Sequence, residues 1–185
     1  WSLWKFLENL PRVEILLHSI HYFDFIRSIL GDPNGVKAKT LGFPGKKTSN
    51  TRTTAILDYG SDIRCALTIN HNHNFGRKFQ ACEFRICGTK GAAYVQLGVN
   101  LNYPKGAPDI LEINLGKEWV NIPLIGSWFI ESFGNRMSQL QRYISGEESE
   151  LIASVKDSWN TMALVEAAYK NSEDPGTLIP KYISR

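Results

Sequence analysis

Apolar positions along the chain repeat with a period that changes from one region to the next. Over residues 13–30 they recur about every 3.6 positions, which predicts an amphipathic helix. Gly31, Asp32 and Pro33 then supply a helix C-cap signal followed by a proline, so the helix is expected to end there. A shorter helix is predicted over residues 2–9, because Pro11 would halt it.

The middle of the chain is typical of β-structure. Short apolar runs alternate with glycine-bearing turns such as residues 58–62 and 88–91. Short connections of this kind join antiparallel neighbours, because a parallel crossover needs about a dozen residues. The predicted strands cover residues 36–41, 53–59, 63–70, 81–87, 92–97, 110–115 and 119–122.

Helical spacing returns in residues 128–145 and 155–171, where Ser154 is a candidate N-cap for the second helix. Residues 177–179 are predicted to add an edge strand. Helix, strands and then helices predict an α+β fold with an open, mostly antiparallel sheet and helices packed on one face. Strand 81–87 is apolar on both faces, so a homo-oligomer formed through the sheet face is expected.

Composition narrows the class of protein. The chain has 185 residues, 43% hydrophobic and 21% charged, which favours a single globular domain spanning residues 1–185. A net charge of +3 without a Lys/Arg run argues against nucleic acid, and no apolar run approaches the roughly 20 residues of a membrane span. Cys65, Cys82 and Cys87 form no CxxC pair, which favours reduced thiols and a cytoplasmic location. No signal peptide is recognised. Because the chain opens at Trp1 instead of Met and starts in the middle of a pattern, we interpret it as a domain of a longer protein.

The most informative segment for chemistry is residues 14–24, which read EILLHSIHYFD. At α-helical spacing Glu14, His18 and His21 share one face, with Asp24 at its edge. Imidazole titrates near neutral pH, so a histidine in such a position is able to pass protons. The alternative is a pair of histidines hydrogen-bonded to carboxylates or backbone at the edge of the core.

A second polar cluster follows the strand ending at residue 70 and contains His71, Asn72 and His73. Its side chains offer hydrogen-bond donors and acceptors suited to hydroxyl groups, although a polar, turn-forming loop explains them equally well. The two segments together hold ligand types for zinc or iron. No recognised metal motif such as HExxH is present, however, and no metal ligand is predicted. GxGxxG, GxxxxGK[ST] and GxSxG are also absent, so the chain has no phosphate loop and no hydrolase nucleophile elbow.

Three stretches resemble the Gfo/Idh/MocA oxidoreductase family. Residues 18–32, HSIHYFDFIRSILGD, are similar to the family's HxxD helix with its Leu-Gly-acidic end. Residues 86–95, ICGTKGAAYV, are similar to its strand–GTxG–strand hairpin. Residues 126–147 and 157–173 are similar to its closing helices, so the resemblance runs in order over nearly the whole chain.

The resemblance implies an NAD(P)-dependent hydride transfer on a sugar, polyol or related hydroxy compound. In this family an N-terminal Rossmann domain, absent here, binds the NAD or NADP, so no cofactor-binding residue is expected in this chain. His21 matches the catalytic histidine of HxxD, and His18 is the second catalytic candidate. The predicted substrate contacts are Asp24, His71, Asn72 and His73.

Leu17 departs from the family pattern, because many members carry an aspartate four residues before the catalytic histidine. Either His18 takes over that role or the proton path differs. Two other functions stay open: a catalytically silent binding or assembly module of the same fold, and a metal-dependent hydrolase or isomerase that uses the histidine clusters.

Overall fold

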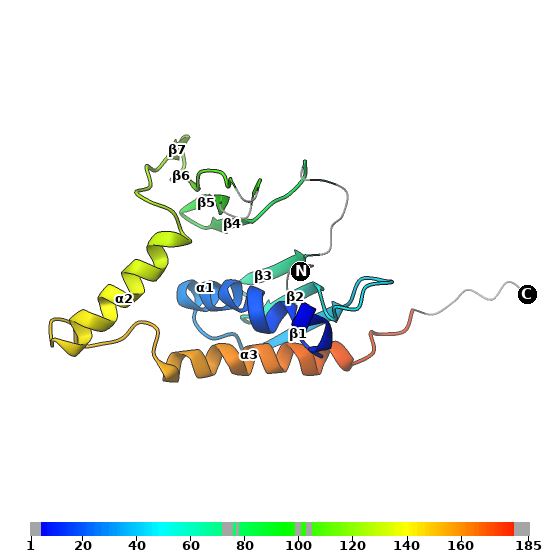
Figure 1. Ribbon diagram of the computed structural model, residues 1–185. Coiled ribbons are helices and arrows are strands. Elements are labelled where there is room, and N and C mark those ends of the chain that lie inside the picture. Colours follow the sequence, from blue (N-terminus) through cyan, green and yellow to red (C-terminus); the bar gives the residue numbers. More distant parts are fainter. Residues whose placement is uncertain (1–4, 72–75, 77, 99–100, 103–104, 180–185) are drawn as a thin grey trace, which may run out of the picture. The chain divides into compact units, whose positions relative to one another are not determined.

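A computed structural model describes residues 5–71, 76, 78–98, 101–102 and 105–179 of the chain (Figure 1). The chain divides into two compact units. Trp1–His73 and Ile152–Arg185 form the first unit, and Asn74–Leu151 form the second. A single domain spanning residues 1–185 stays a prediction. Among the residues described, no helix is long and apolar enough to cross a lipid bilayer.

The first unit contains a three-stranded sheet in the order β1-β2-β3, and both pairings are antiparallel. Its strands are β1 (Gly35–Leu41), β2 (Arg52–Asp58) and β3 (Arg64–Asn70). Side chains alternate between the two faces, so Leu57 and Leu67 are buried while Ile56 is exposed. One face of this sheet therefore forms the core, as the period of the sequence predicts.

Helices cover that buried face. A 3₁₀ turn, η1 (Lys5–Asn9), and a π-helical turn, η2 (Ile15–Ser19), precede α1 (Ile20–Leu30), and α3 (Val155–Glu173) lies beside α1 and β1 (Figure 1). Ser154 caps α3, since its hydroxyl accepts from the N–H of Asp157 at 3.1 Å. The apolar core contains Leu7, Val13, Ile15, Phe23, Ile26, Ala55, Leu57, Leu67, Ile69, Leu164, Val165, Ala168 and Tyr169.

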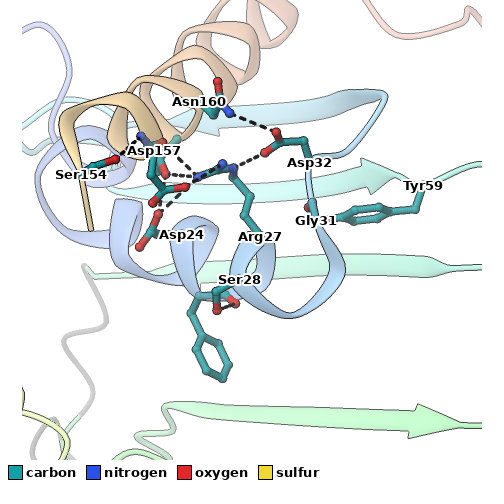
Figure 2. Close-up of polar contacts among 11 residues, drawn as sticks. Asp24, Arg27, Ser28, Gly31, Asp32, Tyr59, Ser154, Asp157 and Asn160 are labelled. Carbon is teal, nitrogen blue, oxygen red and sulfur yellow. Dashed lines mark hydrogen bonds and ion pairs between the residues drawn. The ribbon is translucent and has the colours of Figure 1, made fainter. Parts of the chain in front are cut away.

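A buried arginine joins α1 to α3 (Figure 2). The Arg27 side chain is only 6% exposed. Its guanidinium donates to Asp32 at 2.6 Å and to the Thr161 hydroxyl at 2.5 Å. Asp157 and Asp24 lie farther away, at 3.3 and 3.4 Å. Because these partners come from the two helices and from the turn after α1, Arg27 fixes the helices against each other.

The outer edge of β1 is covered by the end of α3. The amide side chain of Asn171 accepts from the Ala38 N–H at 2.7 Å, and the Ser172 hydroxyl accepts from the Thr40 N–H at 2.9 Å. The backbone N–H groups of Ala38 and Thr40 are therefore already hydrogen-bonded to α3. The predicted edge strand at residues 177–179 is wrong: that segment is irregular. The side chains of α3 occupy this edge of the sheet, so an added strand could not pair with β1 there.

The second unit contains a four-stranded antiparallel sheet in the order β4-β5-β6-β7, followed by a helix. The elements are β4 (Glu83–Gly88), β5 (Gly91–Gln96), β6 (Ile110–Asn114), β7 (Trp119–Asn121) and α2 (Ile130–Ile144). The Asp109 carboxylate ties this unit together, accepting from the N–H groups of Gly98 at 2.6 Å and Trp128 at 2.7 Å. With its N–H bound outside the helix, Trp128 precedes α2, and the helix starts two residues later than predicted.

The α+β class, the antiparallel pairing and the helices packed on one sheet face are confirmed. Each of the seven strands predicted between residues 36 and 122 corresponds to one of β1–β7. The strands are divided between two sheets instead of forming one. The predicted helix at residues 2–9 is present as η1 from Lys5 onward, and its first residues lie outside the described part of the chain.

Candidate functional site

The candidate site is built on the turn that opens the first long helix. Residues Ile15–Ser19 form a π-helical turn, in which hydrogen bonds join residues five apart instead of four. Such turns are rare and often occur at functional sites. Because a wider turn rotates each residue by less than an α-helical one, side chains before and after it do not keep the spacing that an uninterrupted α-helix would give.

Glu14, directly before this turn, is the centre of a buried polar cluster. Its side chain is fully buried, and Oε1 accepts a hydrogen bond from the Ser19 hydroxyl. Nδ1 of His71 lies 2.6 Å from Glu14 Oε2, and Nδ1 of His18 lies 3.8 Å from Oε1. The two imidazole rings meet edge to face, with centroids 4.2 Å apart. The fold thus brings together a carboxylate and two histidines from distant parts of the sequence.

Two neighbouring backbone carbonyls hold the two sides of the cluster. The Asn50 carbonyl accepts from the N–H of Glu14 at 3.3 Å, and the Thr51 carbonyl accepts from the N–H of His71 at 3.0 Å. The Asn50 side chain also donates to the Pro11 carbonyl at 2.8 Å. Because Asn50 and Thr51 are adjacent, the turn before β2 sets the separation between Glu14 and His71.

The surroundings of His18 favour its neutral form. Its pKa is lowered from 6.5 to about 4, mainly because burial disfavours the charged imidazolium; repulsion from His71 and His21 also lowers it, and attraction to Glu14 opposes the shift. His18 is therefore uncharged at neutral pH. Its side chain is 37% exposed, whereas that of His71 is 25% exposed, so the cluster is closed on the Glu14 side and open on the histidine side.

His21 lies outside this cluster. Its side chain is exposed, as is that of Leu17, which is 44% exposed. Of the three residues predicted to share one face, Glu14 and His18 approach within 3.8 Å of each other, while Glu14 is buried and His21 is exposed. The π-helical turn accounts for the difference, because it changes the rotation between Glu14 and the residues of α1.

Asp24 is engaged within the protein. Its Oδ1 accepts from the Thr161 hydroxyl at 2.5 Å and lies 3.4 Å from Arg27, so it belongs to the contacts that join α1 and α3 (Figure 2). Asn72 and His73 lie outside the described residues. Of the predicted site residues, His18 and His71 are brought together, while His21 and Asp24 occupy other positions.

Sequence reasoning missed Ser19 and the central position of Glu14. Glu14 was predicted to share a face with the histidines, but nothing in the local pattern indicates that it is the buried partner of His71. Ser19 follows Glu14 by five residues, a spacing at which side chains of an α-helix point apart. The π-helical turn is what brings the Ser19 hydroxyl to the carboxylate.

The cluster has the composition of a metal site, since Glu14, His18 and His71 each offer a ligand atom within 4.8 Å of the others. A dinucleotide fits the chain poorly. The sequence lacks a glycine-rich phosphate loop, and every strand pairing in the residues the structure covers is antiparallel. Nicotinamide-cofactor binding would therefore need a domain outside this chain.

The architecture is that of the C-terminal domains of oxidoreductases. An oxidoreductase from Agrobacterium radiobacter, solved with NAD+, L-tartaric acid and magnesium, is 25% identical, with a TM-score of 0.68 over 88% of this chain and 48% of that one. An aldose-aldose oxidoreductase from Caulobacter crescentus, solved with glycerol, is 16% identical, with a TM-score of 0.63 over 83% of this chain and 43% of that one. The chain thus spans about half the length of these proteins.

The sequence of residues 4–94 matches the GFO/IDH/MocA C-terminal domain family. Residues 4–94 therefore belong among the C-terminal domains of the Gfo/Idh/MocA oxidoreductases, as the motif of residues 18–32 indicates. No curated protein matches it.

Proposed function

We propose that this chain is the substrate-side domain of an NAD(P)-dependent dehydrogenase or reductase that acts on a sugar, polyol or related hydroxy compound. The observation that carries the proposal is the position of His21, which is exposed on α1 in a domain of an oxidoreductase family. Solved proteins of similar fold include one with bound NAD+ and tartaric acid and one with glycerol, which supports a hydroxylated substrate.

The chain's own contribution would be to bind the substrate and manage its proton. NAD or NADP, held mainly by another domain, would supply the hydride chemistry. An exposed histidine such as His21 is accessible to a substrate hydroxyl, and imidazole is the commonest general acid–base group at neutral pH. His18 is the second candidate for this role, although burial lowers its pKa to about 4 and makes it a weaker base than an ordinary imidazole.

The predicted substrate contacts Asp24, His71, Asn72 and His73 remain part of this proposal. Asp24 would act by holding α1 in place, since its carboxylate already bonds Thr161. His71 would contribute from the open side of the cluster, at the end of β3. A cytoplasmic location and a homo-oligomer formed through a sheet face also belong to the proposal.

A catalytically silent binding or assembly module is the second candidate. Leu17 favours it, because an exposed leucine, 44% accessible, stands where many relatives have an aspartate beside the catalytic histidine. A leucine neither moves a proton nor orients a hydroxyl group. In this case the fold would be kept for binding while hydride transfer is lost.

The full-length protein that contains this chain separates the two candidates. It should reduce NAD+ or NADP+ with at least one member of a panel of sugars, polyols and hydroxy acids, followed by nicotinamide absorbance. His21→Ala should lower turnover by about 10²-fold, the usual scale for losing a general acid–base group. Ser28→Ala, an exposed change on the same helix, is the matched control and should leave turnover intact. Absence of turnover with every compound would favour the silent module. Unchanged turnover in His21→Ala would remove His21 from the mechanism.

A further inference from the structure

We propose that Glu14, His18 and His71 form a binding site for one divalent transition-metal ion, with zinc as the best match. The three side chains come from the segment before η2, from η2 itself and from the residue after β3. Their ligand atoms lie within 4.8 Å of one another. This inference is independent of the proposed hydride chemistry, and it is tested without nicotinamide or substrate.

The donor set selects the kind of ion. Two imidazoles and one carboxylate suit zinc and its neighbours in the first transition row, whereas magnesium and calcium prefer an all-oxygen shell. Three protein ligands also leave one position of a tetrahedral ion open to water or a small molecule. The exposed fractions agree with this arrangement, because Glu14 is fully buried while His18 and His71 are 37% and 25% exposed.

The distances are close to those of an occupied site. Ligand atoms of a tetrahedral zinc lie about 3.4 Å apart when each is about 2.05 Å from the ion. The separations here are 2.6 Å for the Nδ1 of His71 and 3.8 Å for the Nδ1 of His18, each measured to an oxygen of Glu14. Small side-chain rotations would therefore lengthen the distance from His71 to Glu14 and shorten the distance from His18 to Glu14.

Backbone hydrogen bonds hold the main chain around the cluster in place without a bound metal ion. Asn50 and Thr51 bind the main chains of Glu14 and His71, and the π-helical turn directs His18 toward the same carboxylate. The Ser19 hydroxyl donates to Glu14 Oε1, the oxygen that lies 3.8 Å from His18 Nδ1, and such an outer contact orients carboxylate ligands in metal sites. A buried carboxylate also needs compensating charge, which a divalent cation supplies.

The alternative is a purely hydrogen-bonded cluster, in which Glu14 is satisfied by Ser19 and His71 alone. The 2.6 Å contact with His71 is compatible with that arrangement. In that arrangement His18 Nδ1 stays 3.8 Å from the carboxylate, whereas a shared metal ion would draw the two ligand atoms together.

Metal titration of the full-length protein decides between them. After chelation and desalting, the protein should bind one equivalent of Zn²⁺ per chain in calorimetry, and Co²⁺ should give the intense visible absorption of a tetrahedral site. Mg²⁺ should not compete. Glu14→Gln and His71→Gln should each weaken Zn²⁺ binding by at least about 10-fold. His21→Ala, an exposed histidine on the next helix, is the matched control and should bind as the unchanged protein does.

Each other outcome counts against the site. Less than one equivalent of Zn²⁺ per chain, or the weak spectrum of octahedral Co²⁺, would overturn the proposal without any variant. If His21→Ala weakened Zn²⁺ binding and His71→Gln did not, the ion would bind elsewhere. Circular dichroism checks that Glu14→Gln remains folded. If Glu14→Gln does not fold, His71→Gln serves as the second variant, because the His71 side chain is 25% exposed.

Discussion

Replacing Arg27 by methionine should destabilise the protein far more than replacing Arg12, although each arginine contacts a carboxylate of α3. Arg27 is 6% exposed and bonds Asp32 and the buried Thr161, with Asp157 and Asp24 nearby. The carboxylates themselves are 42–56% exposed, so each pair contributes on the scale of a surface salt bridge, about 0.5 kcal/mol. The buried bond from a charged donor to Thr161 adds about 1.5–3 kcal/mol.

These contributions sum to about 3–4.5 kcal/mol for Arg27→Met, which is more than a hundredfold in the folding equilibrium. Arg12 is 36% exposed, pairs with a 56% exposed Glu166 and lies over the Tyr169 ring, so Arg12→Met should cost about 1 kcal/mol or less. Urea unfolding followed by circular dichroism measures both values. A cost below 1 kcal/mol for Arg27→Met, or equal costs for the two variants, would refute the view that Arg27 fixes α1 against α3.

Two further predictions concern the sheet and the histidine cluster. Leu57→Ala should lower the free energy of unfolding by about 2–5 kcal/mol, because Leu57 is 1% exposed. Ile56→Ala should lower it by less than about 1 kcal/mol, because Ile56 is 49% exposed. A larger loss for Ile56→Ala than for Leu57→Ala in thermal or urea unfolding would contradict the register of β2. The His18 pKa is about 4 in the folded protein and about 6.5 for an ordinary histidine, so between these pH values the folded protein binds fewer protons than the unfolded chain. The free energy of unfolding of the metal-free protein should therefore fall as the pH drops from 7 to 5. His18→Gln should show a smaller fall over the same range, and identical pH profiles would mean that His18 is not the titrating group.

The strands and the caps were predictable because their signals are local. Alternating side chains place Leu57 inside and Ile56 outside, and Ser154 stands directly before a helical run. Gly31 ends α1 with a φ of 79°, a conformation that glycine adopts at little cost. Each of these features depends on residues within a few positions of one another.

The failed predictions have long-range causes. Residues 177–179 have the composition of a strand, but Asn171 and Ser172 already occupy the N–H groups along the β1 edge. All three strands of the first sheet lie between Glu14 and His71 in the sequence, and the contact depends on how the turn at Asn50 and Thr51 folds back. No periodicity within a helix or a strand carries that information.

The π-helical turn links the two proposals. In an uninterrupted α-helix His18 and His21 would lie on one face with Glu14, and the two imidazoles would be interchangeable candidates for proton transfer. The turn separates them: His18 faces a fully buried carboxylate, and His21 is exposed on α1. If a metal ion occupies the first position, His18 is held as a ligand. The family's HxxD histidine, His21, is then the imidazole of this helix that remains available to exchange a proton with a substrate hydroxyl.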